Sequence, residues 1–399
     1  MIPVLRHNQR RARPLPPQPG GVCVVGSGTR FLSGISYYTH RLALTLAERY
    51  SVSVLLVRRM IPRRLYPGAT RVGQCLTDIS YPDGVAVLDG IDWFWGPSAL
   101  RGVLFLARHR PRFVVMQWWT GAVLHSWLLL AAAARLFGAQ LVIEFHEVQD
   151  VGEQMLPLVG RYVDVGLPLL LRLSSAVVVH SDFDRAAIED RYGTLAGHVL
   201  RIPHGPYTLF TSTRSLAAPA PDCPCRLLFF GVIRPFKGLD DLIRAFDSLP
   251  PREAEDLHLT VIGETWEGFT QPNRLITASP YRDRITFVNR YVTDAELAAA
   301  LDEADAVVLP YHRSSSSGPL QMAMGYGLPV VVTSVGGLVE AAQGYGGALF
   351  VPPKDVGALA DALSRVSTLR GRRFPAPCDW SATMDGFEKL FSVLEQTGP

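Results

Sequence analysis

Two cationic residues follow a buried apolar stretch in the middle of the chain, and together they could bind an anion. Residues Leu227–Phe230 are apolar without interruption, as expected of a strand covered on both faces. Gly231 ends this stretch, Arg234 and Lys237 follow, and apolar residues at helical spacing come next, in 239–246. A turn between a parallel strand and a helix presents backbone N–H groups and the positive end of the helix dipole. The pattern therefore predicts an anion site, with two solvated surface cations as the simpler alternative.

The same order of strand and helix recurs along the chain. Apolar runs of strand length alternate with segments that have apolar residues at helical spacing, and this alternation predicts parallel sheets with helices on both faces. The predicted strands are 22–26, 52–57, 113–116, 141–145, 176–179, 227–230, 259–262, 285–288, 306–309 and 330–332. The predicted fold class is α/β, with two Rossmann-like doubly wound domains in tandem.

A polar passage rich in proline and alanine separates the two series of strands, and its composition is typical of a linker. The predicted units are a disordered basic, proline-rich leader (1–20), an N-terminal domain (21–205), the linker (206–225), a C-terminal domain (226–378) and a final segment (379–399). The final segment has the spacing of an amphipathic helix, which we expect to pack back on the N-terminal domain.

The composition limits the classes of function. The chain has 399 residues, of which 48% are hydrophobic and 19% charged, so it can bury large cores. A net charge of +3 is too small to indicate nucleic-acid binding. The five cysteines are scattered and suggest no disulfide framework, which fits a reducing cytosol. The leader lacks the apolar core of a signal peptide, and Ala122–Phe137 is shorter than the ~20 residues of a membrane span, so we predict a buried helix there.

A nicotinamide cofactor is poorly supported. Gly26 and Gly28 follow the first strand as in a dinucleotide fingerprint, but the third glycine is missing. Arg58 and Arg59 stand near the end of the second strand, where such a site needs an acidic residue.

Several motifs in order resemble the GT-B glycosyltransferases, specifically family GT4. They are SGISYYTHRLALTLAERY, IEFHE, VVVHSDFDRAAIEDRYG, RIPHGPYTLF, LLFFGVIRPFKGLDDLIRAF, HLTVIGE, ITFVNRYVTDAELAAALDEADAVVLPY and SGPLQMAMGYGLPVVVTSVGGLVEAA. The resemblance implies that a nucleotide-diphosphate sugar binds in the cleft between an N-terminal acceptor domain and a C-terminal donor domain. It further implies sugar transfer with retention and without a metal ion, and we expect no cofactor beside the donor.

The resemblance gives roles to individual residues. Arg234 and Lys237 match the basic pair that stabilises the leaving diphosphate, and His146 matches a histidine near the transferred sugar. The expected donor-binding residues are Gly34, Ser36, Gly231, Gly263, Glu264, Ser316, Ser317, Gly318, Pro319 and Leu320. His204 matches a motif that leads into the linker and is expected to belong to a hinge.

Simpler explanations exist for several of these residues. His146 is alternatively a hydrogen-bonded structural residue at a strand end, and Gly34 a glycine that only a turn requires. Glu264 is alternatively a solvated loop carboxylate. Ser314–Ser317 either hold a diphosphate at a helix start, through their hydroxyl and N–H groups, or form a flexible loop.

The chain departs from the family pattern at one point. Many GT4 members carry two glutamates eight positions apart before a G-x-P motif, and counting back from Gly327 these positions fall near Ser314 and Met322. Both carboxylates are missing, and an SG-x-L version of the loop, found in some subgroups, replaces them. The alternative to an active transferase is therefore a catalytically inactive GT-B subunit that binds a sugar nucleotide or a partner transferase.

The acceptor is less defined than the donor. A glycan, a lipid-linked glycan or a small molecule would each fit, and nucleic acid would not. Four arginines within 58–64 surround apolar residues, which suits contact with an anionic membrane, although a solvated arginine-rich loop is the simpler interpretation. We expect a cytoplasmic protein, either free or peripheral at the inner face of the membrane. Trp93, Trp95, Trp118 and Trp119 could stack on a sugar or pack in the core.

Overall fold

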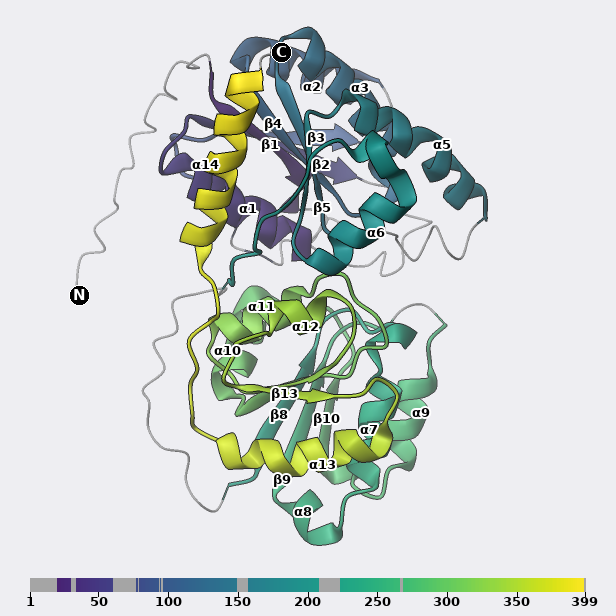
Figure 1. Ribbon diagram of the computed structural model, residues 1–399. Coiled ribbons are helices and arrows are strands. Elements are labelled where there is room, and N and C mark those ends of the chain that lie inside the picture. The colour runs from purple at the N-terminus through teal and green to yellow at the C-terminus, as the bar shows by residue number, and fades with distance from the viewer. Residues whose placement is uncertain are drawn as a thin grey trace, which may run out of the picture.

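The alternating strands and helices form two parallel sheets, one in each half of the chain (Figure 1). The computed structural model describes residues 20–29, 34–59, 77, 79–92, 94, 96–148, 157–207, 223–265 and 268–397. The predicted α/β class with two doubly wound domains is confirmed. Most of the predicted leader, residues 60–64 and most of the predicted linker lie outside the described residues.

The N-terminal sheet has seven strands in the order β3-β2-β1-β4-β5-β6-β7, and every pair is parallel. The strands are β1 (Val22–Ser27), β2 (Val52–Arg59), β3 (Ala86–Asp92), β4 (Phe113–Trp118), β5 (Gln140–Phe145), β6 (Ala176–Val179) and β7 (Val199–Arg201). Four central strands are buried along their whole length, which explains why their sequences read as unbroken apolar runs.

Helices cover both faces of this sheet. They are α1 (Gly34–Ala47), α2 (Pro97–His109), α3 (Leu124–Leu136), α5 (Pro157–Leu173), α6 (Asp182–Tyr192) and α14 (Trp380–Thr397). Val22 and Val24 face the core beneath α1 and α14, whereas Cys23 and Val25 face the core beneath α2, α3 and α5. The alternation of side chains along β1 thus divides the domain into two apolar layers.

The C-terminal sheet has six parallel strands in the order β10-β9-β8-β11-β12-β13. The strands are β8 (Cys225–Phe230), β9 (Leu257–Ile262), β10 (Ile285–Val288), β11 (Ala306–Leu309), β12 (Val330–Thr333) and β13 (Ala348–Val351). The helices are α7 (Leu239–Asp247), α8 (Pro251–Glu255), α9 (Gln271–Ala278), α10 (Asp294–Glu303), α11 (Gly318–Gly325), α12 (Gly337–Ala341) and α13 (Val356–Val366). Short 3-10 turns lie at Gly121–Val123, Gly193–Ala196, Pro235–Lys237, Arg282–Arg284 and Ser367–Leu369.

The last helix, α14, leaves the C-terminal domain and packs on the N-terminal one (Figure 1). Phe391 stacks on Phe113, with 4.2 Å between the ring centroids. Glu395 pairs with Arg112 at 2.9 Å, and the indole N–H of Trp380 donates to the carbonyl of Pro206 at 2.6 Å. The chain therefore connects the two domains twice, once through residues 202–224 and once before α14.

Three strands of the structure are absent from the predicted set, namely β3, β7 and β13. All three lie at an edge of a sheet. β3 alternates between half-buried and exposed residues over its first half, and β13 is buried only at its last residue. An edge strand is covered less than a central one, so its sequence lacks the unbroken apolar run on which the prediction relied.

Segment Ala122–Phe137, which has enough apolar residues to suggest a membrane span, belongs to α3 and the turn before it. Its buried side packs on the N-terminal sheet, as predicted. Among the described residues, no helix combines the length and the apolarity that crossing a membrane requires.

Gly238, between the turn Pro235–Lys237 and α7, gives a test of how the fold holds the basic turn. Its φ is 68°, and a Cβ atom there would lie 1.9 Å from the carbonyl oxygen of Pro310. We expect Gly238→Ala to lower the free energy of unfolding by ~3 kcal/mol or more, because it adds backbone strain and a clash with another strand end.

The matched control is Gly344→Ala, since Gly344 has a φ of 80° and open space around its Cα. Gly344→Ala should lower the free energy of unfolding by ~1 kcal/mol, because it adds the backbone strain without a clash. Urea denaturation of both variants measures the difference, and equal losses would show that the contact with Pro310 is unimportant.

Candidate functional site

The basic turn after β8 places a lysine where the two domains meet. Arg234 begins the 3-10 turn Pro235–Lys237, and Gly238 follows in the left-handed conformation. The ammonium of Lys237 lies 3.7 Å from the centre of the Tyr311 ring. The field of Glu147, from the other domain, also acts on this ammonium. The predicted anion site is thus lined by both domains.

The environment of Lys237 disfavours its charge. The pKa of Lys237 is lowered to about 7, mainly because the ammonium is buried; Glu147 opposes this shift, and nearby Arg234 adds to it. The protein alone therefore does not fully replace the hydration that the ammonium of Lys237 has lost. An anionic ligand would complete the compensation and raise the pKa again.

The serine loop, defined here as Ser314–Ser317, leads into α11. The hydroxyl of Ser317 accepts from the backbone N–H of Leu320 at 3.2 Å and caps the helix, and Ser314 donates to the carbonyl of Ser316 at 2.8 Å. Gly336 and Gly337 support the loop from below, because a Cβ atom on either would lie 2.0 Å from a carbonyl oxygen of the loop. The loop is therefore held by specific contacts, and the capped helix start is available to an anion.

Predicted donor-binding glycines converge around Tyr207. A Cβ atom on Gly318 would lie 2.6 Å from the Tyr207 hydroxyl and 3.9 Å from the Cα of Gly34. On the other side, a Cβ atom on Gly231 would lie 3.5 Å from the ring of Pro319, and one on Gly263 would lie 1.9 Å from the carbonyl of Gly231. The structure therefore brings together backbone from the start of α1, the ends of β8 and β9, and the start of α11.

Several polar contacts join the domains. The hydroxyl of Ser316 donates to the carbonyl of His146 at 3.1 Å. The carboxylate of Glu340, at α12, accepts from the backbone N–H groups of Asp182 and Phe183 at 2.6 and 2.7 Å, at the start of α6. Asp294 accepts from the hydroxyls of Tyr37 and Thr77. The domains are closed on each other in this conformation.

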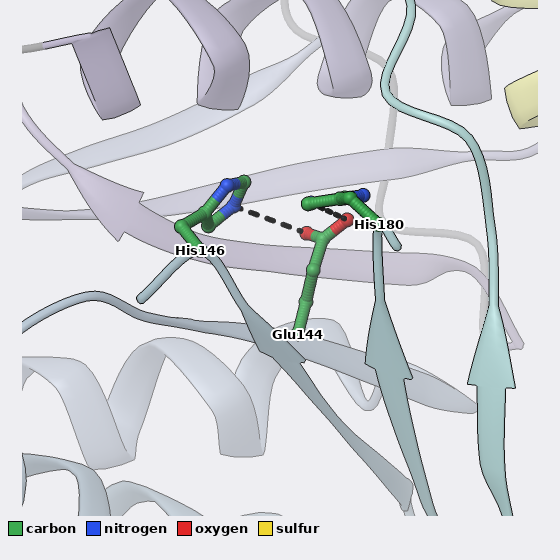
Figure 2. A group of neighbouring side chains, drawn as sticks. All are labelled: Glu144, His146 and His180. Carbon is green, nitrogen blue, oxygen red and sulfur yellow. Dashed lines mark ion pairs between the residues drawn. The ribbon is translucent and has the colours of Figure 1, made fainter. Parts of the chain in front are cut away.

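The side chain of His146 points into a buried polar cluster at the ends of β5 and β6 (Figure 2). Its Nε2 lies 3.8 Å from a carboxylate oxygen of Glu144, and the Nε2 of His180 lies 3.9 Å from the other oxygen. Tyr38 donates to Glu144 at 2.6 Å, and the ring of His204 lies 5.2 Å from that of His180. His204, expected in a hinge, thus has its ring in this cluster.

Burial determines the protonation of the cluster. It raises the pKa of Glu144 to about 8 and lowers the pKa of His180 to about 4 and of His204 to about 3. The pKa of His146 is also well below its ordinary value, because of burial and of the neighbouring His180 and His204. The histidines are therefore neutral at pH 7, and His146 is available as a hydrogen-bonding group and not as a cation.

Glu144, His146 and His180 are residue types that bind metal ions, and their ligand atoms lie within 4.8 Å of one another. The fit to zinc is poor, because tetrahedral ligands at ~2.0–2.1 Å from the ion are roughly 3.3 Å apart. The carboxylate also accepts from Tyr38. Metal-independent chemistry remains our prediction.

Two predicted donor-binding residues occupy supporting positions. The hydroxyl of Ser36 donates to the carbonyl of Gly28 at 3.1 Å and lies 3.2 Å from the hydroxyl of Ser27, so it braces the loop after β1. Glu264 is half-buried, and its carbonyl accepts from the N–H of Ile233 at 2.9 Å.

The arginines and tryptophans that suggested contact with a membrane or a sugar are partly engaged elsewhere. Arg58 makes a bidentate contact with Asp92, at 2.7 and 3.2 Å. Trp118 and Trp119 are buried in the core of the N-terminal domain. Trp93 and Trp95 lie outside the described residues.

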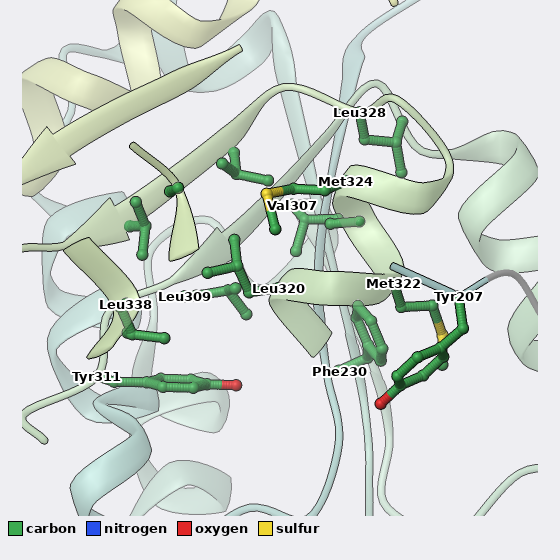
Figure 3. Packing of buried hydrophobic residues seen from close by; sticks show 14 of the residues in the cluster. Tyr207, Phe230, Val307, Leu309, Tyr311, Leu320, Met322, Met324, Leu328 and Leu338 are labelled. Atoms are coloured by element: carbon green, nitrogen blue, oxygen red, sulfur yellow. The ribbon is translucent and has the colours of Figure 1, made fainter. Parts of the chain in front are cut away.

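The two positions at which many family members carry glutamates, 314 and 322, have different surroundings in the structure. Met322 is buried on α11, and its side chain lies beside those of Phe230 and Tyr207 (Figure 3). Ser314 is half-buried and belongs to the serine loop. The position of the second carboxylate is therefore part of an apolar layer.

Sequence reasoning missed Glu144, Tyr38, His180, Tyr207 and Glu340 as members of the site. Glu144, His180 and Tyr207 each lie in or just after a strand, in motifs that carried the family resemblance. That location was the available signal, because the carboxyl ends of parallel strands meet at one edge of a sheet. For Glu340 only the tertiary contact with α6 reveals a role.

Comparison with protein families confirms the predicted resemblance. Residues 33–205 match the model described as "Glycosyl transferase 4-like domain", and residues 224–368 match "Glycosyl transferases group 1". The two matches cover strands β2 to β7 of the N-terminal sheet, the whole C-terminal sheet and the basic turn, whereas β1 precedes the first match. The chain belongs to the group 1 glycosyl transferases, family GT4. Its assignment to an SG-x-L subgroup remains a prediction.

Curated relatives include several sugar transferases. D-inositol 3-phosphate glycosyltransferase of Mycolicibacterium smegmatis is 34% identical over 179 residues, which are 41% of this chain and 39% of that protein. GDP-mannose:glycolipid 4-beta-D-mannosyltransferase of Xanthomonas campestris is 33% identical over 132 residues, 33% of this chain and 35% of that protein. The matches thus span less than half the length of these two relatives.

Solved structures share the fold over nearly the whole chain. Sucrose-phosphate synthase of Thermosynechococcus elongatus aligns with a TM-score of 0.63 at 18% identity, covering 95% of this chain and all (100%) of that one. The Anabaena protein HepE in complex with UDP and glucose aligns with a TM-score of 0.62 at 16% identity, covering 94% and 99%. These similarities establish the GT-B fold.

The low pKa of Lys237 predicts pH-dependent nucleotide binding. Above pH 7, Lys237 of the unliganded protein is increasingly deprotonated. It must be protonated again to bind a diphosphate. Between pH 7.5 and 9, where the phosphates are already ionised, we expect the affinity for a nucleoside diphosphate to fall by up to ~10-fold per pH unit, with proton uptake on binding. Calorimetry in buffers of different ionisation enthalpy measures both.

The control is Lys237→Arg, because a guanidinium stays charged throughout this range. Its affinity should be independent of pH. An equally steep profile in the variant would assign the titration to another group.

The contact between Glu340 and α6 predicts a role in closure. Glu340→Ala removes two charge-assisted hydrogen bonds across the domains, and we expect the KM for the donor sugar to rise ~10-fold while the melting temperature stays close to that of the wild type. Glu255→Ala, an exposed residue on α8, is the control. An unchanged KM would mean that this contact does not contribute to donor binding.

Proposed function

We propose that the chain is a glycosyltransferase that moves a hexose-type sugar from a nucleotide-diphosphate sugar to an acceptor held mainly by the N-terminal domain. The observation that carries the proposal is the position of Lys237, an incompletely compensated cation at the junction of the two domains. The start of α11 and four predicted donor-binding glycines surround the same junction. The relatives named above act on D-inositol 3-phosphate and on a glycolipid according to their names, which supports an acceptor with hydroxyl groups.

Charge stabilisation is the main contribution that these residues would make. As the glycosidic bond of the donor breaks, negative charge develops on the leaving diphosphate, and Arg234 and Lys237 would stabilise it. The serine loop and the capped N-terminus of α11 would hold the same phosphates. Because Lys237 is already desolvated, the gain on meeting this charge is larger than it would be in water.

Positioning and exclusion of water would complete the mechanism. Neutral His146 would contact the reacting sugar after a small reorientation of its ring toward the cleft, and Gly34 would allow close approach of the backbone. Closure through Glu340, Ser316 and Asp294 would exclude water and suppress hydrolysis of the donor. We expect retention of configuration at the anomeric carbon, as the family resemblance implies.

The first experiment is a screen of the purified protein with UDP-, GDP-, ADP- and dTDP-sugars by thermal shift and by release of nucleotide. Selective stabilisation by one donor, with slow hydrolysis, would support the proposal and identify the donor. Binding without turnover on a broad acceptor panel would instead favour the inactive subunit. Absence of binding to every donor would contradict both.

Removal of either cation tests the assigned roles. Arg234→Ala and Lys237→Ala should each reduce transfer ~100-fold or more, because stabilisation of the leaving diphosphate is lost. The fold should remain intact, since both half-buried side chains lie on a turn between the domains and outside the apolar cores. Arg252→Ala, on exposed α8, is the control. Near-normal turnover in both variants would refute the role of the turn.

Chelation tests metal independence. We expect unchanged turnover in the presence of EDTA, because the described group of residues that could ligate a metal, Glu144, His146 and His180, is poorly spaced for zinc. Loss of activity that zinc or magnesium restores would contradict this expectation.

A further inference from the structure

Three neighbouring helices on the outside of the N-terminal domain, α2, α3 and α5, carry an unusual number of exposed apolar side chains. Thirteen large apolar side chains are exposed among the described residues, and seven of these are on the three helices. The seven are Leu100, Leu104, Leu136, Leu158, Tyr162, Val165 and Leu169. We call this surface the outer helical face. α3 packs between α2 and α5, and α5 forms the margin of the domain (Figure 1).

The apolar residues of α5 form a stripe along its outer side. Leu158, Tyr162, Val165 and Leu169 recur at helical spacing, and Leu158 has 84% of its surface exposed. The inner side of the same helix carries a separate buried set, beginning with Val163. The outer stripe is therefore not needed for the core of the domain, and its exposure suggests a contact with another apolar medium.

The charge of the outer helical face is strongly one-sided. Between Asp92 and Glu144 the sequence has five arginines and no acidic residue. Exposed Arg112 pairs with Glu395 of α14, and the other exposed arginines on or beside the three helices are Arg101, Arg108, Arg110, Arg161 and Arg172. Among the described residues, none of these five pairs with a carboxylate, and the one acid of α5, Asp164, pairs with Arg191 at 2.7 Å.

We propose that the outer helical face binds the surface of a bilayer that contains anionic lipids. Protruding leucines and a valine would enter the boundary between head groups and acyl chains, and the arginines beside them would contact lipid phosphates. Helices with apolar and basic residues on one exposed side have the composition of interfacial anchors. The helices would lie on the membrane, with their inner sides still packed on the sheet.

The topology connects this face to the cleft. α2, α3 and α5 each follow a strand of the parallel sheet, so each begins at the carboxyl edge of the sheet, where the other domain docks. Leu158 and Leu100, near the starts of α5 and α2, therefore belong to the end of the face nearest the cleft. A bound bilayer would bring a lipid-linked acceptor to that edge. Membrane binding itself does not rest on the proposed transferase activity.

A second copy of the chain is a poorer partner for this face. In a symmetric dimer the same surface contacts itself, so the arginines of one copy would oppose those of the other. The only carboxylate among the described residues of the three helices is Asp164, which is already paired. Anionic lipid supplies the opposite charge that a second copy lacks.

The test is flotation of the full-length protein with vesicles of phosphatidylcholine, with and without phosphatidylglycerol. We expect binding that requires phosphatidylglycerol and weakens as salt is added. Arg101→Glu with Arg161→Glu should lower the partition coefficient at least ~25-fold, since one arginine near an anionic surface contributes ~5-fold. Leu158→Ser with Val165→Ser should lower it at least ~10-fold. These four side chains are exposed, so the melting temperature should not change.

The matched control is Arg252→Glu with Phe350→Ser, which exchanges an exposed arginine and an exposed phenylalanine on the C-terminal domain. It should bind as the wild type does. Binding that does not depend on phosphatidylglycerol, or face variants that bind as well as the control, would overturn the proposal. It would also be overturned if the wild type does not bind vesicles and instead forms a dimer in sedimentation velocity that the face substitutions dissociate. Nucleotide release by the same samples separates failure of membrane binding from failure of the transferase.

Discussion

A lysine desolvated at the contact between two domains is the feature on which the arrangement of this protein depends. Lys237 is charged only if something compensates for the water that it has lost, and Glu147 of the other domain compensates in part. The turn that carries it needs glycine at 238, because the carbonyl of Pro310 leaves no room for a side chain. Strand β8, the turn and α7 therefore fix the position of Lys237, and the proposed diphosphate would meet a cation that is already in place.

Close approach of the two domains follows from small residues at the same junction. Gly34 and Gly318 lie on either side of the Tyr207 hydroxyl, and Gly336 and Gly337 lie against the serine loop. Side chains at Gly318, Gly336 and Gly337 would not fit, so glycine allows close approach of the backbone at this junction. Among the described residues, Glu340 and Ser316 bond backbone groups across the junction, whereas Asp294 accepts from two hydroxyl groups.

The central strands and the basic turn could be predicted because each is encoded locally. An unbroken apolar run indicates a strand covered on both faces, and the cations of the turn follow it within seven residues. The edge strands β3, β7 and β13 could not be found in this way, since their burial is incomplete. The cluster around Glu144 was also hidden. It forms only when β5, β6 and the segment after β7 become neighbours, and sequence distance does not reveal that order.

The absence of a glutamate at position 322 is related to the packing of Tyr207, the tyrosine after β7. Met322 lies beside Phe230 and Tyr207, in a layer from which water is excluded. A carboxylate at 322 would be desolvated there, and burial would raise its pKa. Methionine fills the same space without that penalty. In the proposed transferase, the serine hydroxyls, the helix start and Lys237 would recognise the donor, so specificity would depend more on phosphate and backbone contacts than on a carboxylate.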